Sequence, residues 1–196
     1  MSDTAPWASE VAESLLADAL PRRWRHSQGV ARTARSLAGV LGDRADLLEA
    51  AAWLHDIGYS PSLDVTGFHP LDGARYLRDV LRVDMEICRL VAHHSCAILE
   101  AEQRGLAAEL AAEFPMPDAS LWDALTYCDV TTSPDGRPVT VTGRIAEIRQ
   151  RYGAGHLVTE FIGRAEPHMI GAVRRIQRRL GLDDDGIPPL RVVVQA

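Results

Sequence analysis

The spacing of apolar residues constrains the fold of this chain more than any other feature. Apolar residues recur every three or four positions along most of the 196 residues, as they do on one face of a helix. Alternation of β-branched and polar residues is scarce before the final segment, residues 187–196. The pattern therefore predicts an all-α fold, and the length suits a single-domain helical bundle over residues 1–196 with a short tail.

Prolines, glycines and turn-rich stretches divide this pattern into separate helices. Residues 59–68 favour a loop, and His69 followed by proline is typical of a helix cap and a first turn. The segment with Pro167 predicts a long helix that is broken near that residue. We expect helices over about 7–20, 23–41, 47–56, 70–81, 84–95, 98–113, 120–129, 139–152 and 155–180.

Charge and hydropathy exclude several classes of function. The formal net charge is -6, so the overall field repels polyanions and we expect no nucleic-acid polymer as a partner. No apolar run approaches the roughly 20 residues of a membrane helix, and the N-terminus lacks the order of a signal peptide. We therefore expect a cytoplasmic protein with no membrane partner, while its oligomeric state stays open.

The cysteines and the late basic run favour structural roles. Cys88, Cys96 and Cys128 are odd in number and have no C-x-x-C spacing, so they predict reduced core thiols rather than disulfides or a thiolate zinc site. The arginines at 174, 175, 178 and 179 fall on consecutive helical turns, which is typical of a solvated helix face.

Two polar residues occupy positions that the helical pattern turns inward. His26 shares its stripe with Val30, so its imidazole should face the interior. Asp129 follows Leu125 by four residues, which directs its carboxylate to the core side. A buried carboxylate is costly unless a cation or strong donors compensate it. Both positions therefore predict a compensating partner inside the protein.

The doublet His55-Asp56 raises the same problem at the end of an otherwise apolar helix, just before Gly58. One divalent metal ion would compensate these groups together, because two imidazole nitrogens and two carboxylate oxygens form a mixed site that suits Fe, Mn, Co, Ni or Zn. Such an ion acidifies a bound water and polarises a phosphoryl oxygen. The sequence thus indicates metal-assisted hydrolysis.

Further histidines can hold a second ion. His69 begins a predicted helix, and His93 and His94 end another. Leu90 lies three residues before His93 and four before His94, so periodicity does not choose between the two histidines.

The order of these residues resembles the HD superfamily of phosphohydrolases over roughly residues 22–135, with the closing helices at about 139–181 lying beyond it. The resemblance is carried by His26, by WLHDIGYSP around His55 and Asp56, by FHPLDGARYL around His69, by LVAHHS around His93 and His94, and by TYCD ending at Asp129. Two features depart from the HD-GYP cyclic-dinucleotide phosphodiesterases: Tyr59 follows HDIG where those relatives have lysine, and no GYP follows the histidine pair.

The resemblance implies an HD-type helical fold and a site with two divalent transition-metal ions. It assigns His26, His55, Asp56 and Asp129 to the first ion, with Asp56 bridging, and His69 and His93 to the second. His94 then contacts the substrate or a further metal, and Asp56, Asp129 and His94 are the expected catalytic residues.

The expected activity is hydrolysis of a phosphoester of a nucleotide or another small phosphorylated metabolite by metal-activated water. Arginines at 22, 23, 25, 137 and 144 are within reach of a phosphate in the sequence pattern, although surface charge is the ordinary role of such residues. Two alternatives remain open: a di-iron oxygenase with the same fold, and a non-catalytic module that senses a ligand or metal.

Overall fold

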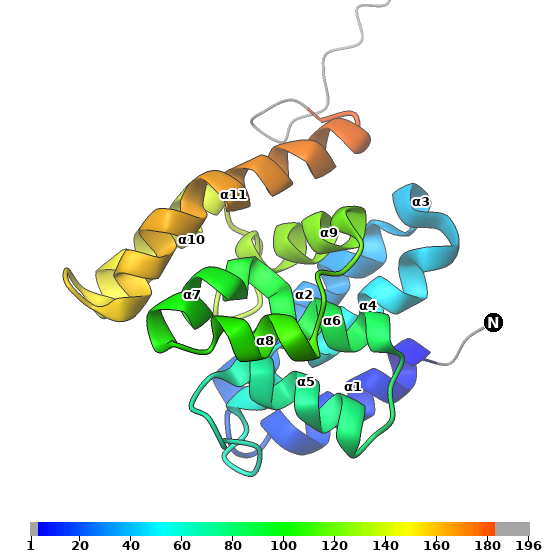
Figure 1. Ribbon diagram of the computed structural model, residues 1–196. Coiled ribbons are helices and arrows are strands. Elements are labelled where there is room, and N and C mark those ends of the chain that lie inside the picture. Colours follow the sequence, from blue (N-terminus) through cyan, green and yellow to red (C-terminus); the bar gives the residue numbers. More distant parts are fainter. Residues whose placement is uncertain (1–3, 183–196) are drawn as a thin grey trace, which may run out of the picture.

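The structure is a computed structural model that describes residues 4–182, and it is helical along most of that range (Figure 1). Among the described residues, the only strand-like pairing is a single bridge between Thr132 and Pro138. The predicted all-α fold is confirmed. The α-helices are α1 (Thr4–Leu16), α2 (Pro21–Ser36), α3 (Ala38–Leu41), α4 (Ala45–Leu54), α5 (His69–Asp79), α6 (Met85–His93), α7 (Ala97–Arg104), α8 (Ala107–Glu113), α9 (Ala119–Val130), α10 (Val141–Tyr152) and α11 (Leu157–Arg179), and the 3-10 turns are η1 (Gly42–Arg44), η2 (Ile57–Tyr59) and η3 (His94–Cys96).

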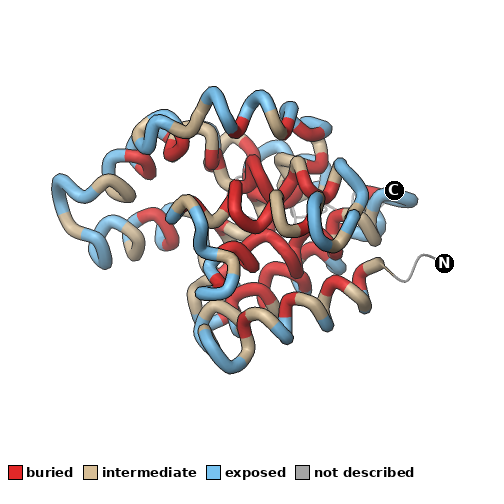
Figure 2. Tube along the Cα trace, turned by 60° about the horizontal axis from the view of Figure 1, so that its bottom comes forward, coloured by how far each residue is buried: buried red, intermediate tan, exposed pale blue. Residues whose placement is uncertain are grey.

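Helix α4 forms the centre of the core, because it is apolar on nearly every side. It packs against α1, α2, α6 and α9, and the whole stretch from residue 50 to residue 58 is buried. A helix that is hydrophobic all round is stable only when other helices surround it. Figure 2 shows the buried segments gathered in the middle of the molecule, with exposed residues on the outer turns. The end of α4 consequently delivers His55 and Asp56 to the interior.

Three helix boundaries differ from the predicted ones. The expected helix over 23–41 is divided at Leu37 into α2 and α3. The expected helix over 98–113 is divided at Gly105, which adopts a left-handed conformation with φ of 74° and ends α7. Conversely, Pro167 does not break α11, which continues with buried residues on both sides of the proline. Packing of one apolar face outweighs the hydrogen bond that proline removes.

Helices α10 and α11 form a hairpin with a small core of its own. This core contains Cys96, Val130, Ile145, Phe161, Ile162, Ala165, Met169 and Val173. The hairpin packs on α9, η3 and α7, and Figure 1 shows it lying across these elements, away from α1 and α5. It therefore covers the region where α9 and η3 end.

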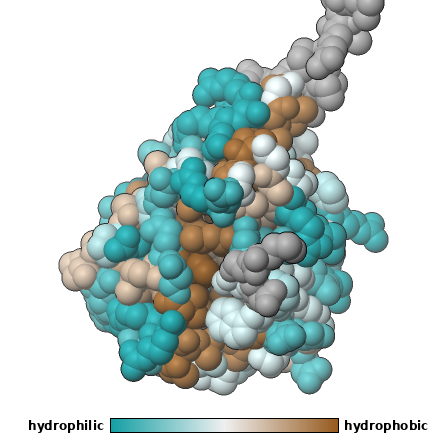
Figure 3. Space-filling view, turned by 90° about the vertical axis from the view of Figure 1, so that its right-hand side faces the viewer, coloured by the Kyte–Doolittle hydropathy of each residue, from teal (hydrophilic) through white to brown (hydrophobic). Residues whose placement is uncertain are grey.

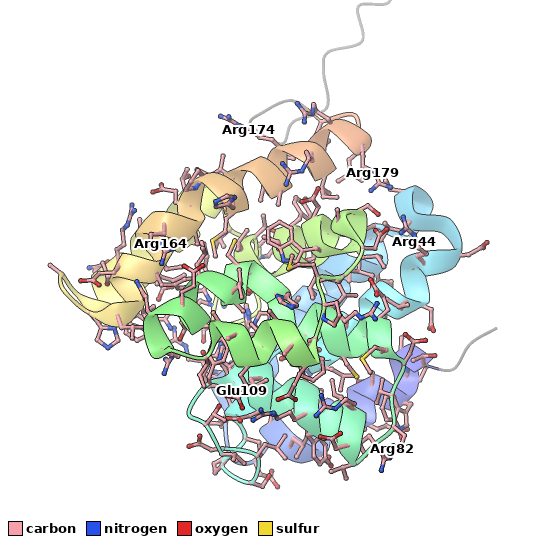
Figure 4. All side chains as sticks on the ribbon, viewed as in Figure 1. Arg44, Arg82, Glu109, Arg164, Arg174 and Arg179 are labelled. Carbon is pink, nitrogen blue, oxygen red and sulfur yellow. The ribbon has the colours of Figure 1, made fainter. Side chains whose placement is uncertain are left out.

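The basic run on α11 does more than face solvent. Arg175 forms two hydrogen bonds of 2.6 Å with Asp123 of α9, and Arg179 donates to the carbonyl of Val40 at 3.0 Å. Arg174 points away from the body of the protein (Figure 4). All four arginines are exposed, as predicted, and two of them also attach α11 to its neighbours.

Cys88, Cys96 and Cys128 are buried and form no disulfide, as predicted. Seen from the side of α3, apolar side chains form a strip between charged areas (Figure 3). No helix within residues 4–182 has both the length and the apolar character needed to cross a bilayer. The β-branched tail, residues 187–196, lies outside the described residues.

Candidate metal centre

The polar residues singled out in the sequence come from five separate elements and meet beside the end of α4. His26 lies in the second turn of α2, His55 caps the C-terminus of α4, and Asp129 is the penultimate residue of α9. His69 is the first residue of α5, where Phe68 and not His69 takes the N-cap position. The imidazole of His69 is therefore free to face the cluster.

The ligating atoms form two groups, each within 4.8 Å, and the first consists of His26, His55 and Asp129. The Nε2 atom of His26 lies 2.9 Å from Oδ1 of Asp129. It is 3.9 Å from Oδ2 of Asp56, which in turn is 3.2 Å from Nε2 of His55. One carboxylate oxygen of Asp56 thus faces this first group.

The second group consists of Asp56, His69 and His94. The other oxygen of Asp56, Oδ1, lies 3.5 Å from Nε2 of His69 and 3.8 Å from Nε2 of His94. The two imidazole nitrogens are 3.2 Å apart. Asp56 therefore lies between the two groups and presents one oxygen to each, as a bridging carboxylate does.

His93 lies outside both groups, although the family resemblance assigned it to the second ion. Its Nε2 donates to the carbonyl of Phe114 at 2.6 Å, and its own carbonyl accepts from Nε1 of Trp122 at 2.8 Å. The helix α6 ends at His93, and the chain then turns so that His94 faces Asp56. His94 thus occupies the position in the second group that the family resemblance gave to His93, and His93 connects α6 to neighbouring segments through hydrogen bonds.

Backbone carbonyls orient three of the four clustered histidines. The Nδ1 atoms of His26, His55 and His94 donate to the carbonyls of Ser133, Ala52 and Val91, at 3.0, 2.8 and 2.7 Å. A nitrogen that donates to a carbonyl carries the ring proton of the neutral imidazole, so Nε2 of each ring is left with a lone pair. Such a bond to the outer nitrogen is typical of histidines that bind metals through the inner one.

This arrangement fits a divalent cation. Nε2 of His26 faces a carboxylate oxygen at 2.9 Å, and two acceptors at that distance require either an extra proton or a shared cation. Nε2 of His55 is buried and finds no well-directed hydrogen bond among residues 4–182. Imidazole nitrogens together with carboxylate oxygens suit a transition metal. The residues present therefore match the donor set of a metal centre.

Charge interactions keep both carboxylates ionised. Burial alone would raise the pKa of Asp56, but the Arg23 guanidinium and the His55 imidazole hold it well below its ordinary value. Burial opposes charge on Asp129 too, yet the adjacent His26 ring in its protonated form, together with the charge of His55, outweighs burial and lowers the pKa. Ionised carboxylates are the form in which these groups bind cations.

Burial has the opposite effect on the histidines of the second group. It lowers the pKa of His69, and the neighbouring His94 lowers it further. Burial likewise lowers the pKa of His94, with His55 adding to the shift. Both rings are consequently neutral at pH 7, and neutral imidazole is the form that ligates metals.

Glycine contacts fix the distances between the elements. A Cβ on Gly58 would lie 2.0 Å from the carbonyl oxygen of His69 and 2.7 Å from the amide nitrogen of Gly73. A Cβ on Gly29 would lie 2.6 Å from the Cα of Gly136. The first approach holds η2 against α5, and the second holds α2 against the loop that follows α9. Bulkier residues at these positions would separate the ligands.

Three residues of the site, Ser95, Arg104 and Arg151, were not identified from the sequence. Ser95 adopts a left-handed backbone with φ of 48°, an unusual conformation for a residue other than glycine, and its hydroxyl donates to Oδ2 of Asp129. Arg104 of α7 and Arg151 of α10 line the pocket that opens onto the cluster. No sequence signal separates Ser95 from other serines, since its role depends on the turn after α6.

A pocket of about 280 Å³ opens onto the cluster. Its lining includes four residues of the cluster, Asp56, His69, His94 and Asp129, and apolar residues of the α10–α11 hairpin, among them Ile148, Val158, Phe161 and Ile162. The guanidinium groups of Arg23, Arg104, Arg144 and Arg151 also line it. The pocket thus joins a potential metal centre to cations and an apolar surface.

Three of the other arginines named in the sequence analysis lie apart from the cluster. Arg22 and Arg25 pair with Asp135 at the surface, and Arg137 is exposed. His156 caps α11 at the pocket mouth by accepting from the amide of Val158. Of the five arginines considered for a phosphate, the structure brings Arg23 and Arg144 to the pocket.

The cysteine thiols are poorly suited to act as nucleophiles. Burial raises the pKa of Cys96 to about 12 and that of Cys88 to about 11. Burial also raises the pKa of Cys128, which is next to Asp129. All three therefore stay protonated at neutral pH, and packing accounts for them.

Comparison with known proteins agrees with this geometry. Residues 23–128, more than half of the chain, match the HD domain family. The chain belongs to the HD domain family. HD domains bind divalent metals and form a superfamily of metal-dependent phosphohydrolases. The resemblance inferred from the sequence is thereby confirmed, and the α10–α11 hairpin lies outside the matched residues.

The curated relatives match a smaller part of this HD domain protein. Ribonuclease Y of Streptococcus agalactiae serotype III is 34% identical over 70 residues, which is 36% of this chain and 13% of the relative. Ribonuclease Y of Streptococcus agalactiae serotype Ia matches to the same extent. The chain therefore spans only about an eighth of the length of these relatives. No solved structure matches this chain.

Proposed function

We propose that this HD domain protein hydrolyses a phosphoester of a nucleotide or another small phosphorylated metabolite. One observation carries the proposal: the pocket of about 280 Å³ is lined by three kinds of residue together, namely the ligating groups, several arginines and apolar side chains. A phosphorylated organic molecule needs these three kinds of residue, one for the reacting phosphate, one for its charge and one for its organic part.

Two ions are supported by the two groups of ligating atoms. His26, His55 and Asp129 with one oxygen of Asp56 would hold the first ion, and His69, His94 and the other oxygen of Asp56 the second. When bound, divalent ions lower the pKa of a water molecule and polarise a phosphoryl oxygen. Asp129 is kept ionised and in place by His26 and by the Ser95 hydroxyl.

Two arginines of α10 that line the pocket, Arg144 and Arg151, share one carboxylate between them. This carboxylate is that of Glu147, and Arg144 is only 8% exposed. Two guanidinium groups on one carboxylate leave an uncompensated charge and unused donors, which suits a phosphate. The apolar residues of the hairpin bound the same space and would exclude water from the organic part of the substrate.

A test uses protein loaded with Mn²⁺, Fe²⁺, Co²⁺ or Zn²⁺ and a panel of nucleoside phosphates and sugar phosphates, with released phosphate as the readout. We expect turnover of at least one compound and its loss in Asp56→Asn, which keeps the shape of the side chain but not the bridging charge. Asp79→Asn, which changes an exposed carboxylate paired with Arg78, is the matched control and should retain activity. Full metal occupancy without turnover of any compound would refute the proposal.

RNA is a second candidate substrate, favoured by the name of the Streptococcus relatives. The net charge of -6 and the small pocket volume favour a small substrate instead. A labelled RNA oligonucleotide in the same panel separates the two, because cleavage of RNA without hydrolysis of any small phosphate would support the second candidate. Oxygen consumption measured on the iron-loaded protein would point to an oxygenase.

A further inference from the structure

Arg23 occupies a boundary between two hollows. It lies one turn before His26 on α2 and lines the pocket that opens onto the ligating groups. It also lines a second hollow of about 310 Å³, together with His26, Arg144 and Arg151. A guanidinium in this position can reach the metal centre and the pocket without moving its helix.

The contacts of Arg23 fix the position of its guanidinium plane and leave most of its N–H donors without a hydrogen-bond partner. Its Nη1 atom donates to Oδ2 of Asp56 at 2.8 Å, and its Cζ atom lies 4.0 Å from the centre of the Tyr59 ring. The Tyr59 ring stacks in turn on the ring of His69 at 3.7 Å. The bond to Asp56 is the one hydrogen bond that the guanidinium makes among residues 4–182, although arginine has five N–H donors.

The oxygen that Arg23 contacts is the same one that a first metal ion requires. Oδ2 of Asp56 lies 3.2 Å from Nε2 of His55 and faces the first ligating group, whereas Oδ1 faces His69 and His94. A guanidinium and a divalent cation repel each other and bind the same lone pairs. Arg23 and the ion therefore compete for one carboxylate oxygen.

We propose that Arg23 binds the phosphate of the substrate. Before metal ions bind, Asp56 accepts a hydrogen bond from the Arg23 guanidinium and keeps it beside the pocket; once metal ions bind Asp56, the guanidinium is released. This inference rests on the proposed function and makes it more specific. Metal binding weakens the bond from Arg23 to Asp56, and the guanidinium, still supported by the face of Tyr59, turns its donors to an anion in the pocket. Binding is then ordered, with metal before phosphate.

The side chain at position 59 supports this role. An aromatic ring orients a guanidinium plane through stacking and cation-π attraction, and it provides no competing charge. Tyr59 is 39% exposed at the pocket mouth, so the stacked guanidinium remains accessible from the pocket. Lysine in place of Arg23 would lack both the flat shape and the forked donors.

The test measures two equilibria on the full chain and needs no turnover. Mn²⁺ affinity is measured by competition with a fluorescent chelator, and inorganic phosphate affinity is measured by calorimetry on Mn²⁺-loaded protein. In Arg23→Gln we expect Mn²⁺ to bind several-fold more tightly and phosphate about 10- to 100-fold more weakly, as the loss of a charged hydrogen bond predicts. Arg23→Lys should keep wild-type Mn²⁺ affinity and recover only part of the phosphate affinity.

Arg25→Gln is the matched control, because Arg25 lies on the same helix and pairs with the exposed Asp135; both affinities should stay at the wild-type values. Circular dichroism checks that each variant folds. If Arg23→Gln does not fold, the phosphate affinity of Arg23→Lys tests the proposal. Weaker Mn²⁺ binding in Arg23→Gln, or phosphate affinity equal to wild type in either variant, would overturn the proposal.

The outcome also separates this inference from the proposed function. Arg23-dependent phosphate binding without hydrolysis of any compound in the panel would support the inference and refute the enzymatic function. A wild-type protein that binds no Mn²⁺ would overturn both.

Discussion

Replacing Gly58 by alanine tests the approach that holds the two ligating groups together. A Cβ at this position would lie 2.0 Å from the carbonyl oxygen of His69 and 2.7 Å from the amide nitrogen of Gly73. Both are backbone atoms, so η2 and the start of α5 must separate by ~1 Å or more to restore van der Waals distances. Overpacking of this kind costs ~1–3 kcal/mol, and because no flexible side chain can yield, we expect ~3 kcal/mol from the upper end of that range.

The same displacement should alter the metal centre. It moves His69 away from Asp56; in the wild-type structure Oδ1 of Asp56 lies 3.5 Å from Nε2 of His69. Metal–ligand distances in proteins vary by only about 0.2 Å. We therefore expect Gly58→Ala to lose one of the two metal ions that we propose for the centre. Urea denaturation followed by circular dichroism gives the free energy of unfolding, and elemental analysis gives the metal content.

Gly39→Ala is the control, because a Cβ on Gly39 in α3 would meet no atom within 4 Å. Alanine in a helix is more favourable than glycine by ~1 kcal/mol, so this variant should be as stable as the wild type or slightly more so. If Gly58→Ala unfolds at the wild-type urea concentration and keeps the wild-type metal content, the close approach does not set the geometry of the centre.

Two further predictions concern stability away from the site. Asp118 caps α9 by accepting from the amides of Ser120 and Leu121, so Asp118→Ala should cost ~1 kcal/mol at pH 7. The Ser120 hydroxyl, followed by the Leu121 amide and Arg44, lowers the pKa of Asp118 to about 2. The cap therefore contributes its full stabilisation above the unfolded pKa of 3.8 and loses it as the pH falls towards 2. Urea titrations should show the free energies of unfolding of the variant and the wild type converging over this pH range. Pro167 lies inside α11 and is exposed, so Pro167→Ala should raise the free energy of unfolding by up to ~3 kcal/mol, and a lower melting temperature would contradict a continuous α11.

The helical pattern was sufficient to predict the fold class and the inward direction of His26 and Asp129. Both inferences use only local periodicity, which backbone geometry fixes within a few turns. The resemblance then placed Asp56 between two ligand sets, and the structure shows one of its oxygens directed to each group. Residues whose orientation follows from helix geometry were therefore accessible from the sequence.

The choice between His93 and His94 was not accessible, because it depends on a turn with no sequence signature. Ser95 and Cys96 have positive φ angles of 48° and 65° although neither is glycine. Tertiary packing of η3 against α9 and α11 imposes this path. Arg23 was equally hidden among several arginines, since only the placement of α2 against α4 decides which of them points inward.

The hydrogen bonds from imidazole Nδ1 atoms to main-chain carbonyls affect how this protein can diverge. Ala52, Val91 and Ser133 supply carbonyl groups rather than side chains, so mutations at these positions can change the residue type without releasing the ring that it holds. Selection can then vary the surroundings of the centre widely while its donor atoms keep their directions. Only changes that redirect the backbone would misdirect the donor atoms. Such changes would also impair folding, so selection would remove them for that reason first.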